Sequence, residues 1–231
     1  MQRWRDELVG KLQVLNTQNI QILSDDHLNQ FISIMENHPV LKGIYSESVG
    51  LWEGYSLRRH TLMVLKQYMK YFGSRNLPQI DKEPFFIILA LHDIGKPLAI
   101  SKGDKNLQHF YTKKIIKDVM VHLPFDLKNY ISLVDGDPIG EYFKGRDIDE
   151  TIDQIGKMSK ASSFEKHLFF ELLMTYYQSD AGSYTKDAGG EPSLEFLFRN
   201  FEFNESKKRL WFAPYYENLF EKLEKNFILK K

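Results

Sequence analysis

Two histidines and two aspartates fall on, or at the end of, helical faces that are otherwise apolar: His60, His92, Asp93 and Asp180. Each alone has an ordinary structural explanation, such as a satisfied core histidine or a helix-terminal carboxylate paired with lysine or arginine. A buried carboxylate costs several kcal/mol unless a cation, a metal or several donors offset that cost. Two imidazoles and two carboxylates that converge in one core are therefore predicted to share a divalent ion.

Helical periodicity dominates the chain and predicts an all-α fold. Three of the predicted helices carry the four polar residues, which lie three or four positions from apolar ones or end an apolar run. The run 84–91 is apolar on every side, which predicts a buried central helix that Gly95 and Pro97 then end. The predicted helices are 3–14, 26–37, 56–72, 83–93, 106–120, 125–134, 147–160, 164–181 and 212–226.

The remaining organisation is simple. The length of 231 residues predicts a single helical domain over 1–231, with its motif-bearing core at about 50–182 and a C-terminal appendage at about 191–231. A short β-hairpin is predicted from 201–203 and 210–212. The segments 135–140 and 181–192 are predicted loops because they are rich in Gly, Ser and Asp.

The composition excludes several kinds of chemistry. The chain has no cysteine, so disulfides, thiolate metal sites, iron–sulfur clusters and a cysteine nucleophile are excluded. The formal net charge is zero, so no overall field draws the protein to nucleic acid or an anionic membrane. The N-terminal residues lack the apolar core of a signal peptide, and no apolar run approaches the roughly 20 residues of a membrane span. These features predict a cytoplasmic protein that has no membrane partner.

Three stretches of the sequence resemble the HD superfamily of metal-dependent phosphohydrolases. EGYSLRRHT at 53–61 resembles the first histidine motif of that family, on a helix entered through a serine cap. ALHDIGKP at 90–97 resembles the histidine–aspartate doublet, and QSDA at 178–181 resembles the distal aspartate. The resemblance covers roughly residues 50 to 182. It implies an HD-type bundle of five or more helices around a metal held by His60, His92, Asp93 and Asp180.

Some HD proteins bind two metals through extra histidines between the doublet and the last aspartate. His109 stands where the first extra ligand is expected, but no His-His pair follows. The sequence instead has VDGDP at 134–138. In this segment Asp135 or Asp137 is a candidate metal ligand or base, and a role in a turn explains each of them at least as well. This departure favours a one-metal site and leaves a two-metal site open.

The resemblance implies hydrolysis of a phosphomonoester or phosphodiester, typically of a nucleotide, by attack of a metal-activated water. Asp93 is expected to bind the metal and to orient that water, and Lys96 to contact the phosphate. Arg58 and Arg59 are weaker candidates for substrate binding, and Glu53 for a supporting carboxylate. Nitrogen and oxygen ligands without sulfur suit Mn, Fe, Co, Ni, Zn or Mg.

Two alternatives use the same residues. In the first, the chain is an HD module that senses a nucleotide or binds a metal without turnover. In the second, which has less support, it is a di-iron oxygenase, but that enzyme needs more histidine ligands than His109 supplies. Lysine-rich clusters at 113–117 and 207–209 leave nucleic-acid processing open, although such clusters are more often solvated faces. The substrate and the oligomeric state are not predicted.

Overall fold

The computed structural model of the chain describes residues 1–17, 23–50, 54–71, 81–184 and 222–228. These residues are mostly helical and include no strand, since their one piece of β-structure is an isolated bridge between Ser48 and Ser56. The predicted all-α fold is confirmed. Glu53, the predicted hairpin within 201–212 and most of the predicted appendage 191–231 lie outside the described residues.

The chain falls into two compact units, Met1–Asp135 and Gly136–Lys231. Their boundary lies in the segment 135–140, which the sequence marks as a loop. Helices α1 to α6 belong to the first unit, and α7 to α9 to the second. The prediction of one domain over the whole chain stays a prediction.

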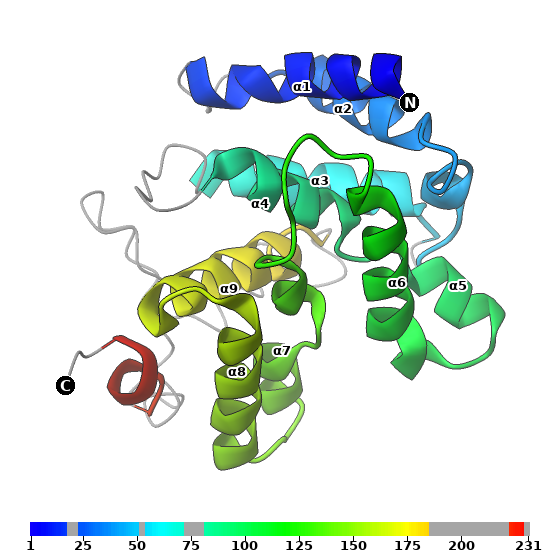
Figure 1. The fold of residues 1–231 in the computed structure, drawn as a ribbon. Helices are drawn as coiled ribbons and strands as arrows, with labels where there is room; N and C mark the ends of the chain where they lie inside the picture. Colours follow the sequence, from blue (N-terminus) through cyan, green and yellow to red (C-terminus); the bar gives the residue numbers. More distant parts are fainter. Residues whose placement is uncertain (18–22, 51–53, 72–80, 185–221, 229–231) are drawn as a thin grey trace. The chain divides into compact units, whose positions relative to one another are not determined.

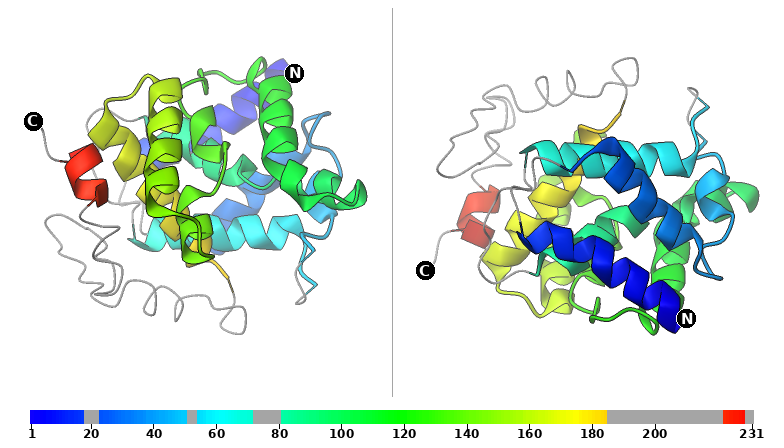
Figure 2. Two further views of the ribbon diagram at one scale, coloured as in Figure 1. Left: turned by 90° about the horizontal axis from the view of Figure 1, so that it is seen from below. Right: turned by 90° about the horizontal axis from the view of Figure 1, so that it is seen from above.

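The helices of the first unit pack in neighbouring pairs. Helix α1 packs against α2 and α4, α2 against α3, α3 against α4, and α5 against α6. The right-hand view of Figure 2 shows α2 crossing in front of α3, with α1 beside α2. Their bounds are α1 (Gln2–Thr17), α2 (Asp25–Glu36), α3 (Leu57–Tyr71), α4 (Lys82–Leu91), α5 (Lys96–Ser101) and α6 (Gln108–Met120) (Figure 1). Short 3-10 turns precede α3 and α6 and follow α6: η2 (Ile44–Ser46), η3 (Lys105–Leu107) and η4 (Ile131–Val134).

Helix α4 is the centre of this unit, as its all-round apolar sequence predicts. Every side chain from Phe85 to Leu91 is at most 2% exposed. Phe86 contacts the ring of Phe31 from α2 and that of Tyr68 from α3. The stretch Lys82–Ser101 is apolar and long enough to cross a membrane, but 78% of its most apolar window is buried inside the structure, as in a core helix.

A pair of histidines joins three elements away from α4. His38, which follows α2, is fully buried and accepts a hydrogen bond from the backbone N–H of Val40 at its Nδ1 (3.2 Å). Its Nε2 lies 3.2 Å from Nδ1 of His122, just after α6, and its ring contacts Trp4 of α1. Burial and then the neighbouring His122 lower the pKa of His38, so this contact is made by a neutral imidazole.

The second unit contains α7 (Pro138–Phe143), α8 (Ile148–Ser162) and α9 (Lys166–Ala181), with a π-helical turn at Glu224–Ile228. Helix α8 packs against α7 and α9, and the π-helical turn packs against α9. Asp147 caps the start of α8 by accepting two backbone N–H bonds, and Ser163 ends it in the left-handed conformation. Helix α9 buries Phe169, Leu173 and Tyr176 and carries Asp180 in its last turn.

Two predicted elements are wrong. The helix predicted at 125–134 is instead a series of turns ending in η4. Asp126 accepts the backbone N–H of Lys128 (2.8 Å), a local bond that competes with helix formation. The segment 135–140, predicted as a loop, contains the start of α7. There Asp137 caps the helix through the N–H of Gly140, and Pro138 takes the first position, where its missing N–H is not needed.

Candidate metal centre

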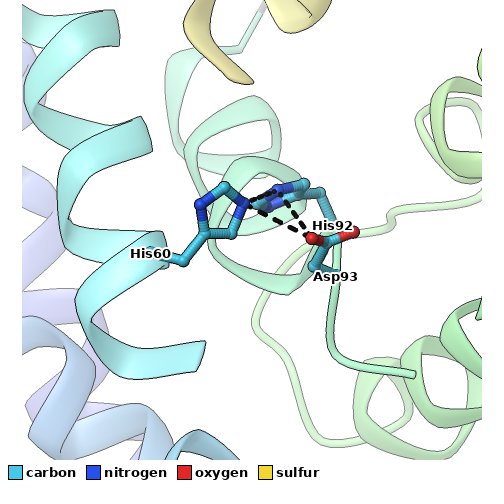
Figure 3. A group of neighbouring side chains, drawn as sticks. All are labelled: His60, His92 and Asp93. Atoms are coloured by element: carbon cyan, nitrogen blue, oxygen red, sulfur yellow. Dashed lines mark hydrogen bonds and ion pairs between the residues drawn. The ribbon is translucent and has the colours of Figure 1, made fainter. Parts of the chain in front are cut away.

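Helices α3 and α4 bring three of the predicted ligands together in the first unit. His60 lies on α3, one turn after Ser56, whose hydroxyl accepts the N–H of Arg59 (3.4 Å) and so caps the helix as predicted. His92 follows the last residue of α4, and Asp93 comes next in the chain. The side chains of His60, His92 and Asp93 point toward one another (Figure 3). All three are buried, with exposures of 0%, 2% and 8%.

The separations of the three side chains suit a divalent metal ion. Nε2 of His60 lies 3.1 Å from Nε2 of His92 and 3.3 Å from Oδ2 of Asp93, and the third separation, from His92 to Asp93, is 3.8 Å. Bonds of about 2.0–2.2 Å to a common metal at right-angled or tetrahedral geometry place neighbouring ligand atoms about 2.8–3.6 Å apart. Two separations fall in this range, and the third exceeds it by about 0.2 Å. The donor set, two imidazoles and a carboxylate, fits Mn, Fe, Co, Ni or Zn.

The backbone of α4 presets one of the ligands. Nδ1 of His92 lies 2.7 Å from the carbonyl oxygen of Leu89, one turn earlier, so it donates its proton there. A histidine that binds a metal is neutral and carries one N–H, so with the proton on Nδ1 the Nε2 of His92 would supply the lone pair, and this nitrogen faces the other two side chains. Metal-binding histidines commonly have such an orienting acceptor behind them. Leu89 is a residue that the sequence motif does not indicate.

Asp93 is held in its ionised form. Burial alone would raise the pKa of this carboxyl, but the charge of Lys96 and the two histidines hold it well below its usual range. Nζ of Lys96 lies 2.9 Å from Oδ2 of Asp93, with its side chain 16% exposed. A carboxylate that is ionised at neutral pH can bind a cation without first losing a proton.

The two candidate arginines are held by neighbouring side chains. Arg58 donates to the carbonyl oxygen of Asn29 and to the hydroxyl of Ser33, both at 2.9 Å, and it pairs with Glu36. These contacts fasten α3 to α2. The guanidinium of Arg59 lies over the ring of Tyr55 at 5.7 Å. The predicted role of both arginines in substrate binding stays a prediction.

Tyr55 is a contributor to the site that the motif does not indicate. Its ring is nearly parallel to that of His60, with their centroids 6.2 Å apart, and it is 4% exposed. Tyr55 therefore packs along the ring of His60 and also lies under the Arg59 cation.

The residues considered for a second metal in the first unit have other contacts. Nδ1 of His109 lies 3.2 Å from the carbonyl oxygen of Val134, and Nε2 lies 3.3 Å from the side-chain nitrogen of Gln108. Asp135 forms an ion pair with Lys113. Neither residue belongs to the cluster of three potential ligands, and the described residues contain no second cluster of this kind. A role in a second metal site stays a prediction.

Two further candidates belong to the second unit. Oδ1 of Asp137 accepts the N–H of Gly140 at 2.9 Å. Burial, and to a lesser extent the negative charge of Asp180, raises the pKa of Asp137 to about 6. The carbonyl oxygen of Asp180 accepts the hydroxyl of Ser183 at 2.7 Å. The roles of Asp180 as fourth ligand and of Asp137 as ligand or base stay predictions.

The turn between α4 and α5 fixes Asp93 and Lys96 in place. The backbone N–H of Lys96 donates to the carbonyl oxygen of Asp93 (2.9 Å), and that of Gly95 donates to the hydroxyl of Thr112 on α6 (3.0 Å). Pro97 does not end the helical course of the chain as predicted, because it lies in the first turn of the new helix α5. We refer to residues 92–96 as the metal corner.

Comparison with known proteins adds no relative: no protein-family model, curated protein or solved structure matches the chain.

Proposed function

We propose that the chain is a metal-dependent phosphohydrolase of the HD type, acting on a phosphomonoester or phosphodiester, with nucleotides as the first substrates to test. The observation that carries this proposal is the buried convergence of His60, His92 and Asp93, with Nδ1 of His92 held by the carbonyl oxygen of Leu89 and its Nε2 facing the other two ligands. The motifs that contain these residues resemble those of HD proteins. A single metal is proposed because the described residues gather one cluster of ligands.

The residues around the cluster support hydrolysis as well as binding. The three side chains that contact the Asp93 carboxylate within the described residues all do so at Oδ2. Oδ1 is therefore the oxygen proposed to orient the attacking water and to accept its proton. A bound divalent ion would lower the pKa of water to about 7 and offset the charge on the phosphoryl oxygens. Lys96 adds a positive charge beside Asp93, where a phosphate oxygen would be held.

The proposal predicts metal-dependent release of product from simple phosphoesters. Purified protein would be stripped of metal and reloaded separately with Mn²⁺, Co²⁺, Ni²⁺, Zn²⁺ or Mg²⁺. It would then be assayed on p-nitrophenyl phosphate, bis(p-nitrophenyl) phosphate and a panel of nucleotides. His92→Gln and Asp93→Asn should each lower turnover at least about 100-fold. His27→Gln is a matched control, because His27 lies on α2, outside the cluster of three ligands, and its Nε2 lies 3.4 Å from the carbonyl oxygen of Lys11.

Metal binding is measured alongside activity. Wild-type protein that binds one equivalent of metal but releases no product would favour a binding module over a hydrolase. Turnover that survives His92→Gln or Asp93→Asn would reject the site. Asp180→Asn tests the fourth ligand in the same titration, and an unchanged metal affinity would remove Asp180 from the proposal.

A further inference from the structure

The metal corner meets α6 at a point where two backbones touch. A Cβ added at Gly95 would lie 2.2 Å from the backbone nitrogen of Thr112 and 2.7 Å from the carbonyl oxygen of Gln108. Ordinary contacts between such atoms are well above 3 Å. Only glycine allows this approach, so the position of the corner depends on the first turns of α6.

One side chain holds the two backbones together. The hydroxyl oxygen of Thr112 accepts the N–H of Gly95 at 3.0 Å, and Thr112 is 1% exposed. Thr112 lies on the buried face of α6 with the apolar side chains Ile116 and Val119. Valine has the same shape as threonine and suits such a face, so packing alone does not account for a hydroxyl there. The buried N–H of Gly95 does, because without this acceptor it would be unsatisfied.

We propose that Thr112 is a positioning residue of the metal centre. Its hydroxyl fixes Gly95 and thereby the two neighbours that act in the site, Asp93 two residues before and Lys96 one residue after. This inference rests on the proposed function, since it assigns Thr112 to the same metal site. Thr112 itself touches neither metal nor substrate.

The connection from Thr112 to the ligand is short. The N–H of Lys96 donates to the carbonyl oxygen of Asp93, and the N–H of Ala99 donates to that of Gly95 (3.0 Å). A shift of Gly95 therefore moves the whole corner, including Oδ2 of Asp93. Metal sites require their ligands within about 0.5 Å of the productive geometry. Loss of an orienting hydrogen bond behind a ligand typically weakens metal binding about 10- to 100-fold.

The test compares Thr112→Val with Thr112→Ser in the full chain. Valine keeps the shape and removes the acceptor, whereas serine keeps the hydroxyl and removes a methyl group. Co²⁺ is the probe, because calorimetry gives its affinity and its visible absorption reports the ligand geometry. Thr112→Val should bind Co²⁺ about 10- to 100-fold more weakly with an altered spectrum, and Thr112→Ser should resemble wild type. Thr151→Val is the control, since Thr151 is a fully buried helical threonine of the second unit whose hydroxyl donates to Asp147.

The outcomes separate the two proposals. Wild-type protein that binds no Co²⁺ would overturn the proposed function and this inference with it. Wild-type and Thr112→Val proteins with equal Co²⁺ affinity and equal spectra would overturn the inference alone. If Thr112→Val does not fold, amide hydrogen exchange of Gly95 in the wild-type protein decides: exchange at least about 100-fold slower than in an unstructured peptide is expected. Exchange at the unstructured rate would refute the Thr112 contact.

Discussion

Replacement of Gly95 by alanine should destabilise the protein more than any ordinary glycine-to-alanine change. The new methyl carbon would lie 2.2 Å from the backbone nitrogen of Thr112 and 2.6 Å from the carbonyl carbon of Tyr111. Relief of these contacts requires a shift of about 1 Å between two backbones, because favourable separations are about 3.5 Å or more. Overpacking of this kind costs about 1–3 kcal/mol. The shift also breaks the buried bond from Gly95 to Thr112, which costs about 1–3 kcal/mol more.

The expected loss in the free energy of unfolding is therefore about 2–6 kcal/mol. At about 2–4 °C per kcal/mol for a chain this long, the melting temperature should fall by roughly 4–24 °C. Differential scanning calorimetry of the metal-free protein measures it. Gly10→Ala is the matched control, since Gly10 lies on an exposed face of α1 with no atom within 4 Å of an added Cβ. That variant should be stabilised by about 0.5–1 kcal/mol. A Gly95→Ala protein that melts with wild type would refute the close approach of the corner to α6.

Three further predictions concern charged and titratable groups. Arg58→Lys should lower the free energy of unfolding, measured by urea titration, by about 1–2 kcal/mol, because lysine cannot reach the three acceptors on α2 together. Glu36→Gln should lower it by less in the same assay. Lys96→Met should bind Co²⁺ about tenfold more tightly by calorimetry, because an ammonium 2.9 Å from Oδ2 of Asp93 competes with the metal; weaker binding would contradict this. Burial lowers the pKa of His38 below 6.5, so below pH 6.5 the unfolded chain binds a proton that the folded chain does not. Stability should thus fall on acidification by at most about 1.4 kcal/mol per pH unit, and His38→Gln should lack this part of the slope in urea titrations from pH 7.5 to 5.

Hydrophobic patterning predicted the elements whose burial is uniform. Helix α4 is apolar on every side, and a segment of that kind has one stable place, the centre of a core. The stripe of α3 likewise placed His60 on a buried face, at 0% exposure. In both helices the free energy gained by burying the apolar face is spread over many side chains. No single local contact can therefore override it.

Patterning failed where a single polar side chain decides the backbone. Leu127, Tyr130 and Leu133 have helical spacing and are all buried, yet the bond from Asp126 to the N–H of Lys128 turns the chain there. At the start of α7, Asp137 provides a helix cap rather than a turn. In both places an aspartate side chain accepts a backbone N–H. The surroundings of the residues that follow the aspartate decide whether a turn or a helix forms.

The site divides along a similar line. The convergence of His60, His92 and Asp93 was predicted, because buried polar groups need partners and the motif supplied their order. The groups behind them were not predicted, since a backbone carbonyl at Leu89 has no side-chain signature. A threonine on an apolar helical face is likewise common enough to carry no signal, which is why Thr112 becomes visible only beside Gly95.

The place of the His92-Asp93 pair at the end of α4 has a geometric reason. Successive residues of an α-helix point about 100° apart around its axis, so two neighbours within a helix cannot direct their side chains at one point. His92 still has helical backbone angles, and its Nε2 faces His60. The chain turns immediately after His92, and Oδ2 of Asp93 therefore lies within 3.8 Å of Nε2 of His92. A ligand pair of adjacent residues thus requires a helix that stops at the first of them. The buried helix supplies the rigid support, and Gly95 allows the turn that follows to lie directly against the backbone of α6.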